Sequence, residues 1–444
     1  MKDRSRRSFI KKSSLAIAGA SLYSSMPSNL FGSNAPSNRV NIGLIGVGFG
    51  MASLSRMLEH SWVHCIAMCD VNQERLENQA NNLKQNYPNN TKNLRLYSDF
   101  RRLLENRDLD GVIIATPDHW HTYIFAAACS LDLAIYVEKP TGHTIAECNT
   151  MIDFQQEYNN IVTTGLWQTS QSFFVEANKI LKTGILGDVF KIHAWLCNGT
   201  DPTIYDPQAQ SVPDSFDYNM WLGPAPSRPY LRERVRSWRN YWDYGGGQQT
   251  DWGVHWIDSV FDGIKALGHE RLYPKSVYSV GYRHPNTMTE TPRNQTSIFQ
   301  YDNFHVVWEQ QVSHLYNRNQ GVAWIGSNGT LVCNRSGFEL IPERRSDGHP
   351  IIPIAKMEGE HEEGGLKNHV DNWLECIRNN NVNTNSPIDK GSFASILCNI
   401  ANISHRLDGQ SLIYIPDEQK FLNNTKADEY ILADYNNDWE YPQL

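Results

Sequence analysis

Residues 38–163 alternate short apolar runs with segments of helical periodicity. The apolar runs are five to seven residues long, and Asn41 and His64 are the polar residues within them. Strands that alternate with helices in this way are typical of a parallel sheet in an α/β fold. The expected strands are Val40–Ile45, Val63–Cys69, Gly111–Ala115 and Leu133–Val137, and the expected helices are Ser53–Glu59, Asn72–Gln85, Asp99–Glu105 and Thr122–Ser130.

The pattern changes from about Asp188 onward, where the strand candidates become longer and more polar. Such strands suit an open, mostly antiparallel sheet with one solvated face. Loops rich in Pro, Gly and Trp interrupt them between residues 198 and 247, and an acidic, irregular tail ends the chain. We therefore predict a second, α+β domain over residues 164–444. Its expected strands include Val189–Cys197, Ser276–Arg283, Asn294–Tyr301 and Asn303–Val312, and its late helices are Gly365–Asn379 and Lys390–Leu407.

Composition supports two soluble domains. The chain has 444 residues, of which 40% are hydrophobic and 20% charged, values that are typical of globular proteins. The eight cysteines are scattered and form no C-x-x-C pair, so the sequence predicts neither a zinc site nor a disulfide framework.

The N-terminal end has the features of an export signal. Arg6 and Arg7 are followed by Phe9 and by the short apolar run Leu15–Ala20, which predicts a twin-arginine signal over residues 1–35 and a periplasmic protein. A simple basic tail is the alternative. Loss of these residues would remove six basic groups and one acid and lower the net charge from −8 to −13. That charge disfavours nucleic acid or a membrane as a partner of the mature protein.

A glycine-rich turn follows the first predicted strand. Gly46, Gly48 and Gly50, with Phe49 between the last two, precede a predicted helix, as in a turn whose backbone amides approach a pyrophosphate. Asp70 ends the second strand, where an acid suits a ribose 2′-hydroxyl and repels a 2′-phosphate. The sequence therefore predicts a Rossmann domain that binds NAD rather than NADP. Asp70 as a cap of the next helix is the plainer alternative, and Met51 stands where the third glycine is usual.

Three further motifs carry candidate chemistry. Ala115–His121 (ATPDHWH) and Val137–Pro140 (VEKP) follow predicted strands at the sheet edge where ligands bind, and Gly245–Asp258 (GGGQQTDWGVHWID) lies in the second region. Together they resemble the Gfo/Idh/MocA oxidoreductase family over nearly all of the mature chain. The loop Asp217–Pro224 (DYNMWLGP) resembles the exported bacterial branch of that family.

The residue types suit the oxidation of an alcohol. His255 has an ordinary pKa of about 6.5, which suits a general base, and Asp251 lies four residues before it, on the same face of one expected helix. Lys139 supplies positive charge to a reacting oxygen. The resemblance implies that Lys139, Asp251 and His255 are the catalytic group. Taken singly, Lys139 also reads as a surface lysine and His255 as a helix histidine.

The resemblance also implies that residues around the nicotinamide come from the first two motifs, namely Thr116, Pro117, His121, Glu138 and Lys139. His119 is expected only to line the cleft. On the substrate side, Trp167, Gln168 and Tyr244 join Asp251 and His255 as candidates, because aromatic rings near Arg239 and Asp243 suit a polyol. Core packing explains many of these aromatic residues equally well.

The expected function is an NAD-dependent oxidoreductase that acts on a secondary hydroxyl of a sugar or glycoside. Because free NAD is scarce outside the cytoplasm, an exported enzyme of this kind is expected to retain its cofactor. Two alternatives remain: a redox-neutral NAD-dependent glycosidase that works through a transient 3-keto sugar, and a non-catalytic sugar-binding protein that holds the cofactor. The resemblance further implies a homo-oligomer formed through the C-terminal sheet.

Overall fold

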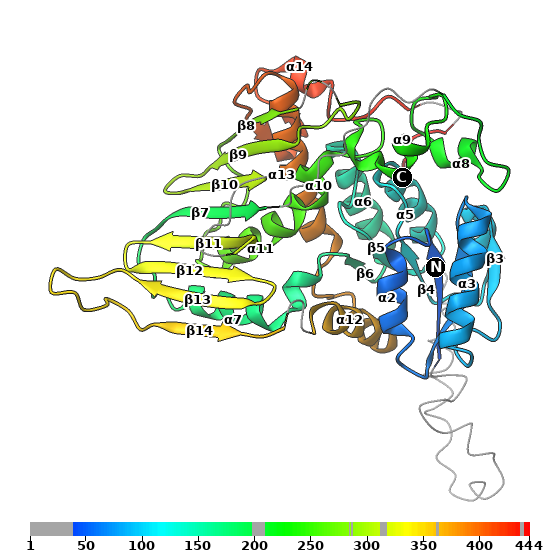
Figure 1. Cartoon of the computed structure of the whole chain (residues 1–444), viewed down its shortest axis with the longest axis horizontal. Coiled ribbons are helices and arrows are strands. Elements are labelled where there is room, and N and C mark those ends of the chain that lie inside the picture. The colour runs from blue at the N-terminus through cyan, green and yellow to red at the C-terminus, as the bar shows by residue number, and fades with distance from the viewer. Residues whose placement is uncertain are drawn as a thin grey trace, which may run out of the picture.

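The computed structural model describes residues 39–197, 209–283, 285, 287–310, 318–360, 364–435 and 439–444. The predicted export signal, residues 1–35, lies outside the described residues. Two sheets lie side by side with helices between them and around the smaller one (Figure 1).

The N-terminal sheet has six parallel strands in the order β3-β2-β1-β4-β5-β6, which confirms the predicted Rossmann domain. Three elements that the sequence pattern did not indicate, β3, α6 and β6, complete it. The strand order reverses between the neighbouring strands β1 and β4, because the chain crosses over the sheet from β3 to β4. Ligands of such sheets bind at the point of reversal. The strands are β1 Val40–Ile45, β2 Val63–Cys69, β3 Arg95–Tyr97, β4 Gly111–Ile114, β5 Ala134–Val137 and β6 Val162–Thr164, and the helices are α2 Gly50–Met57, α3 Gln73–Asn86, α4 Phe100–Leu104, α5 His121–Cys129 and α6 Ile145–Tyr158.

The second sheet has eight strands in the order β14-β13-β12-β11-β7-β10-β9-β8. Its neighbours are antiparallel except for β7 and β10, so the predicted mostly antiparallel sheet is confirmed. Strands β11 to β14 were not predicted. The strands are β7 Val189–Leu196, β8 Ser276–Tyr282, β9 Asn294–Gln300, β10 His305–Gln310, β11 Gln320–Gly326, β12 Gly329–Asn334, β13 Gly337–Pro342 and β14 Ala355–Glu358.

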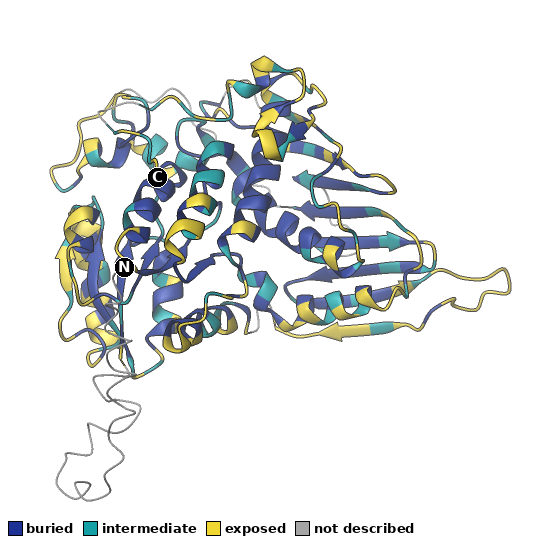
Figure 2. Ribbon diagram, turned by 180° about the vertical axis from the view of Figure 1, so that it is seen from behind, coloured by how far each residue is buried: buried dark blue, intermediate teal, exposed yellow. Residues whose placement is uncertain are grey.

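Helices cover one face of the second sheet. They are α7 Ser172–Lys182, α11 Gly253–Ala266 and α13 Ile388–Arg406. Helix α13 also contacts α6 of the Rossmann domain, and because it is covered on both sides it is buried along most of its length (Figure 2). The opposite face of the sheet exposes apolar side chains such as Tyr278, Val280 and Ile298.

Two C-terminal segments return to the Rossmann domain. Helix α12, Gly365–Asn379, has the predicted bounds and buries Val370 and Trp373 in the core beside β1 and α2. The end of the chain places Trp439 against Trp120, with 4.6 Å between the ring centroids. The remaining elements are α8 Tyr218–Leu222, α9 Arg232–Arg236, α10 Gly247–Asp251, α14 Thr425–Asp428, β15 Tyr414–Ile415 and β16 Lys420–Phe421.

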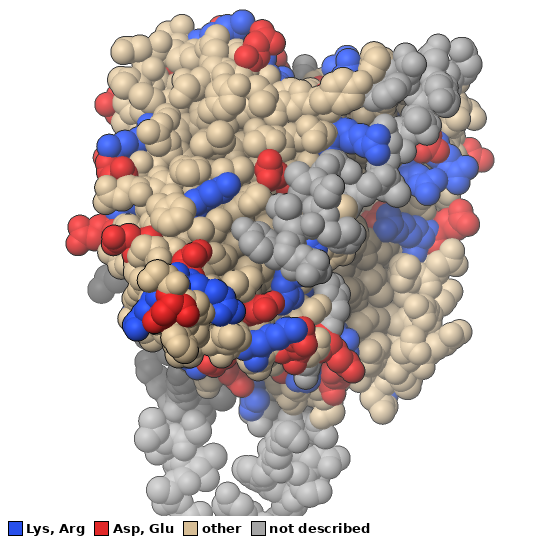
Figure 3. All heavy atoms as spheres, turned by 60° about the vertical axis from the view of Figure 1, so that its left-hand side comes forward, with Lys and Arg blue, Asp and Glu red and all other residues tan. Residues whose placement is uncertain are grey.

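The described residues contain no helix that is both long and apolar enough to cross a bilayer. Over the same residues, no three His, Cys, Asp or Glu side chains are arranged to hold a metal ion. All eight cysteines are free, and all but Cys197 are buried. On the face of the molecule shown in Figure 3, acidic and basic side chains are interspersed.

Candidate active site

The glycine turn after β1 brings α2 close to the sheet. Gly46 has φ +90°, and a Cβ there would lie 2.4 Å from Ala115 O, so only glycine fits. A Cβ at Gly50 would lie 2.6 Å from Leu44 Cδ1 and 2.7 Å from the Ala115 Cβ. Gly50 therefore provides the close helix–strand contact that the third glycine of such turns provides. This explains why Met51, one residue later, is tolerated.

Asp70 connects this turn to the next one. Its carboxylate accepts hydrogen bonds from the backbone N–H of Val47 (3.0 Å) and of Asn72 (2.9 Å). The cap of α3 is Asn72, whose Oδ1 accepts from the backbone N–H of Arg75 at 2.9 Å, so the alternative in which Asp70 itself caps the helix is wrong. A glycine turn at a helix N-terminus, beside an acid at the end of β2, fits a dinucleotide.

Lys139, Asp251 and Arg239 form an ion cluster at the carboxyl edge of the Rossmann sheet. Lys139 follows β5, and its Nζ donates to Asp251 Oδ1 and to Asp251 O, both at 2.6 Å. Arg239 Nε donates to the same Oδ1 at 2.9 Å. Burial alone would raise the pKa of Asp251, but the Lys139 ammonium and the Arg239 guanidinium outweigh it and hold that pKa below its ordinary value. Two cations around one firmly ionised carboxylate leave the cluster with net positive charge.

His255 lies near this cluster but on a separate helix. Helix α10 ends at Asp251 and α11 begins at Gly253, so the prediction that Asp251 and His255 share one helix face is wrong. Within the described part of the chain, His255 Nδ1 has no hydrogen-bond partner, and Asp251 does not orient the ring. Burial, followed by the charges of Lys139 and Arg335, lowers the pKa of His255 well below its ordinary value. The imidazole is therefore neutral near pH 7.

Trp167 and Gln168 form the wall beside His255. Trp167 is partly exposed, and its ring centroid lies 6.5 Å from that of His255. Gln168 is fully buried, and its amide donates to His255 O (3.2 Å) and to Ser259 Oγ (2.9 Å). Arg335, which the sequence did not indicate, donates from Nε to Gln168 Oε1 at 3.0 Å, and its guanidinium carbon lies 4.5 Å from the Trp167 ring centroid. Gln168 therefore supports the start of α11 from behind.

Tyr244 also lies behind the candidate site, like Gln168. Its side chain is fully buried, and its ring centroid lies 4.8 Å from that of Trp221 and 5.3 Å from that of His119. The ring therefore belongs to a cluster of aromatic side chains behind the site.

The predicted nicotinamide contacts lie together around the turn after β4 and the loop after β5. His121 connects these segments, since Nδ1 lies 2.8 Å from Pro140 O and Nε2 lies 3.0 Å from Thr116 O. Burial lowers the pKa of His121 to about 4, so the ring is neutral and donates to one of the two carbonyl oxygens. Glu138 lies against Gly165, and burial raises the pKa of its carboxyl group.

The hydroxyl of Thr116 is buried and, in the described residues, without a partner. Pro117 follows in the same turn, and His119 donates from Nε2 to Trp221 O at 3.0 Å. The sequence-predicted site residues are thus brought to one edge of the sheet, although their contacts with a cofactor stay predictions.

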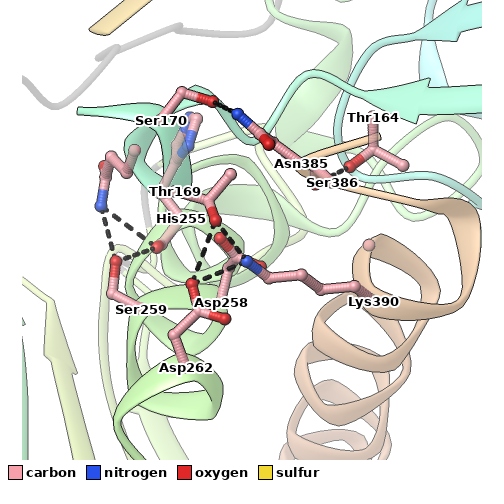
Figure 4. Close-up of polar contacts among 12 residues, drawn as sticks. Thr164, Thr169, Ser170, His255, Asp258, Ser259, Asp262, Asn385, Ser386 and Lys390 are labelled. Atoms are coloured by element: carbon pink, nitrogen blue, oxygen red, sulfur yellow. Dashed lines mark hydrogen bonds and ion pairs between the residues drawn. The ribbon is translucent and has the colours of Figure 1, made fainter. Parts of the chain in front are cut away.

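A second ion cluster lies behind His255 (Figure 4). Lys390 of α13 donates to Asp262 Oδ2 and to Thr169 Oγ1, both at 2.7 Å, and its Nζ lies 3.4 Å from Asp258 Oδ1. Burial raises the pKa of Asp258 to about 7. This cluster joins α11, α13 and the turn at Trp167–Ser170.

The six-stranded parallel sheet and its glycine turn are those of a dinucleotide-binding domain. One family model, described as "Oxidoreductase family, NAD-binding Rossmann fold", matches residues 40–166, and a second, described as "Oxidoreductase family, C-terminal alpha/beta domain", matches residues 174–303. Together they match more than half of the chain. The chain belongs to the Gfo/Idh/MocA oxidoreductase family, and NAD is the cofactor of its Rossmann domain.

Curated relatives resemble part of the chain. Inositol 2-dehydrogenase of Salmonella paratyphi B is 26% identical over 186 residues, which are 40% of this chain and 53% of that protein. A glycosyl hydrolase family 109 protein of Solibacter usitatus is 31% identical over 156 residues, which are 34% of this chain and 36% of that protein. The chain thus spans about half the length, or less, of these relatives.

Among solved structures, an inositol dehydrogenase homolog from Azotobacter vinelandii, complexed with NADH and myo-inositol, has a TM-score of 0.65 and 14% identity. The match covers 85% of this chain and 98% of that one. At this identity the likeness shows a shared fold.

Proposed function

We propose that this protein is an NAD-dependent oxidoreductase that acts on a secondary hydroxyl of a sugar or glycoside. The observation that carries the proposal is the cluster of Lys139, Asp251 and Arg239 beside the neutral imidazole of His255, at the edge of the Rossmann sheet where the dinucleotide binds. The names of the inositol 2-dehydrogenase and of the myo-inositol complex support a polyol or sugar as substrate.

The residues of this chain divide the work at the hydroxyl group. NAD, held by the glycine turn and by the loops after β4 and β5, would supply the acceptor for a hydride from the carbinol carbon. Lys139 uses two of its three N–H donors on Asp251, which leaves the third for the substrate oxygen and its developing negative charge. His255 takes the hydroxyl proton on a ring nitrogen. Because the pKa of His255 is lowered, the ring is neutral and has a nitrogen lone pair free to accept that proton.

Asp251 and Arg239 position the lysine. Asp251 holds Lys139 through one carboxylate oxygen and through its backbone carbonyl oxygen, and Arg239 keeps the carboxylate ionised and fixed. Trp167 presents a partly exposed ring beside His255, which suits stacking on an apolar face of a sugar ring.

A redox-neutral NAD-dependent glycosidase is the second candidate, and the similarity to a glycosyl hydrolase family 109 protein favours it. In this reaction the same residues would first form a 3-keto sugar. The ketone would acidify the neighbouring C–H bond, and loss of that proton would expel the aglycone by elimination. Water would add to the double bond so formed, and the keto group would then be reduced again. The cofactor would return to its starting state in every turnover.

Export and cofactor retention are further parts of the proposal. The paired arginines and the apolar run of residues 1–35 support a twin-arginine route to the periplasm, and a scarcity of free NAD there favours a cofactor that stays bound. The exposed apolar side chains of β8 and β9 support a homo-oligomer formed through the C-terminal sheet.

One experiment separates the candidates. The purified protein is unfolded and the released nicotinamide identified, and native protein is incubated with a panel of glycosides. A keto sugar with accumulating NADH supports the dehydrogenase, whereas aglycone release without net change in nicotinamide supports the glycosidase. Sugar binding without either product would overturn both and leave a cofactor-holding binding protein. Lys139→Met is the control, because either reaction requires the lysine.

A further inference from the structure

Residues 209–246, which we term the crossing segment, lie across the carboxyl edge of the Rossmann sheet. In Figure 1 its helices α8 and α9 are drawn close to α3 and α5. The segment contacts the turns after β1, β2 and β4. Those three turns surround the place where a dinucleotide lies in a Rossmann domain.

The contact with the turn after β2 is made by backbone groups. Gln73 N–H donates to Ser215 O at 2.8 Å, and Asp217 N–H donates to Val71 O at 2.9 Å. Between these two bonds, Asn72 and Phe216 form an antiparallel bridge. The short ribbon begins directly after Asp70, which is the residue expected to bind the adenosine ribose.

The contact with the turn after β4 uses side chains. His119 Nε2 and Trp120 Nε1 both donate to Trp221 O, at 3.0 and 3.1 Å. A Cβ at Gly223 would lie 2.0 Å from the Trp120 ring, so the backbone of the crossing segment packs directly against this ring and leaves no room for a side chain.

The contact with the glycine turn involves an exposed aromatic ring. Phe49 is 72% exposed, the highest value among the large apolar side chains of the described residues. The guanidinium carbon of Arg239 lies 5.1 Å from the Phe49 ring centroid and 4.2 Å from that of Trp238. The same guanidinium donates to Asp251, so one side chain connects the pyrophosphate turn with the catalytic cluster.

From these contacts we infer that the crossing segment is a clasp that closes over the bound dinucleotide. Exchange of the cofactor then requires the ribbon at Val71–Gln73 to separate from Ser215–Asp217. This inference rests on the retained cofactor of the proposed function and assigns residues to it. It needs no particular sugar as substrate, because it concerns only the entry and exit of the nucleotide.

Gln73→Pro tests the clasp by removing one donor of the ribbon. Gln73 is the first residue of α3, a position where proline is tolerated, and Asn72 has φ −101° and ψ 99°, which suit a residue before proline. The matched control Gln73→Ala keeps the N–H. The protein is loaded with NADH, and its release into excess NAD is followed by nucleotide fluorescence. Loss of one backbone bond should speed release about fivefold in Gln73→Pro and leave Gln73→Ala unchanged.

A double substitution, Asn72→Cys with Phe216→Cys, tests whether a ribbon that is locked closed slows the release of NADH. Residues paired in an antiparallel bridge lie within the Cα distance that a disulfide requires. Oxidation should slow NADH release at least tenfold, and reduction of the same sample should restore the faster rate. The reduced form is the control for both substitutions.

Equal release rates in Gln73→Pro and Gln73→Ala, together with equal rates before and after oxidation, would overturn the clasp. Because release is measured without sugar, a protein that turns over no glycoside still tests it. A chain that binds no NADH at all would overturn the clasp and the proposed function together.

Discussion

Two clusters of lysine and aspartate lie near each other in this protein and differ in what surrounds them. Lys139 and Asp251 line the candidate active site, with side chains that are 15% and 17% exposed. Lys390 and Asp258 lie behind His255, with side chains that are 8% and 1% exposed. The first cluster has two cations on one carboxylate, whereas the second has one cation between two carboxyl groups.

The difference shows how one pair of residue types serves two purposes. In the second cluster, Lys390 is surrounded by Asp258, Asp262 and Thr169, so its charge acts on the protein alone. In the first cluster, Asp251 accepts two hydrogen bonds from Lys139 and one from Arg239, and the two cations outnumber the single carboxylate. The first cluster keeps one N–H of Lys139 unused by the contacts with Asp251, which makes it the candidate for chemistry.

The largest expected effect comes from Lys139→Met. Removal of the positive charge beside the reacting oxygen should lower kcat about 10³-fold. The melting temperature should change less than kcat, because the Asp251 carboxylate keeps Arg239 as its ion-pair partner. The measurement is turnover of whichever glycoside reacts in the panel, with a thermal melt of the same sample. A variant that keeps a tenth of the activity would contradict the catalytic role.

Lys390→Met should act on stability instead. It leaves Asp258 and Asp262 buried without their cation, which costs about 3–5 kcal/mol in the free energy of unfolding, as measured by urea denaturation. Lys275→Met is the matched control, since Lys275 and Asp302 are about half exposed and exposed ion pairs contribute little to stability. The activity per folded molecule of Lys390→Met should stay within a few-fold of the parent. A large loss of kcat with unchanged stability would reverse our assignment of the two clusters.

Asp258→Asn should change how stability depends on pH. Burial raises the pKa of Asp258 to about 7, whereas an unfolded aspartate titrates near about 3.9. The folded state therefore binds the proton more tightly, and this contribution is complete below about pH 4 and is lost as the pH rises to about 7. In the parent protein this effect should lower the free energy of unfolding by up to about 4 kcal/mol between pH 4 and 7. The Asp258→Asn variant should lack this decrease. Parallel stability curves for variant and parent between pH 4 and 7 would show that Asp258 is ionised throughout.

The smallest expected effect comes from Arg239→Gln. The carboxylate of Asp251 keeps Lys139, so kcat should fall only about tenfold, with a pH–rate profile shifted because Asp251 loses one of its two cations. Arg228→Gln is the matched control from the same segment, since Arg228 pairs with Asp243 away from the site. If the two substitutions lowered kcat equally, Arg239 would have no special role in positioning Lys139.

The motifs predicted which residues form the site better than they predicted how those residues are arranged. Lys139 and Asp251 follow from the resemblance and do meet in space. The break between α10 and α11 did not follow, because the four-residue spacing of Asp251 and His255 predicts a single helix. Gly253, the first residue of α11, lies against a distant strand, since a Cβ there would lie 3.3 Å from the Trp308 side chain. Arg239 is one of five arginines between residues 228 and 239, and nothing local distinguishes it.

Strands β11 to β13, which were not predicted, do have a signal in the sequence. The apolar runs of β11, β12 and β13 are separated by the two-residue segments Ser327–Asn328 and Arg335–Ser336, a spacing typical of hairpins. Recognition of the second turn would have placed Arg335 at the end of a hairpin. Its position against Trp167 depends on how the whole sheet docks and is not encoded locally.

Helix α12 has a consequence for how the protein is made. Val370 and Trp373 complete the core beside β1 and α2, yet they are synthesised roughly 200 residues after β6. At about 5–20 residues per second, the nascent Rossmann domain waits roughly 10 to 40 s with one side of its sheet incompletely covered. A fragment that stops near residue 163 would keep that apolar side exposed, so it should aggregate or recruit chaperones. The nucleotide-binding half is thus early in the gene but late to finish folding.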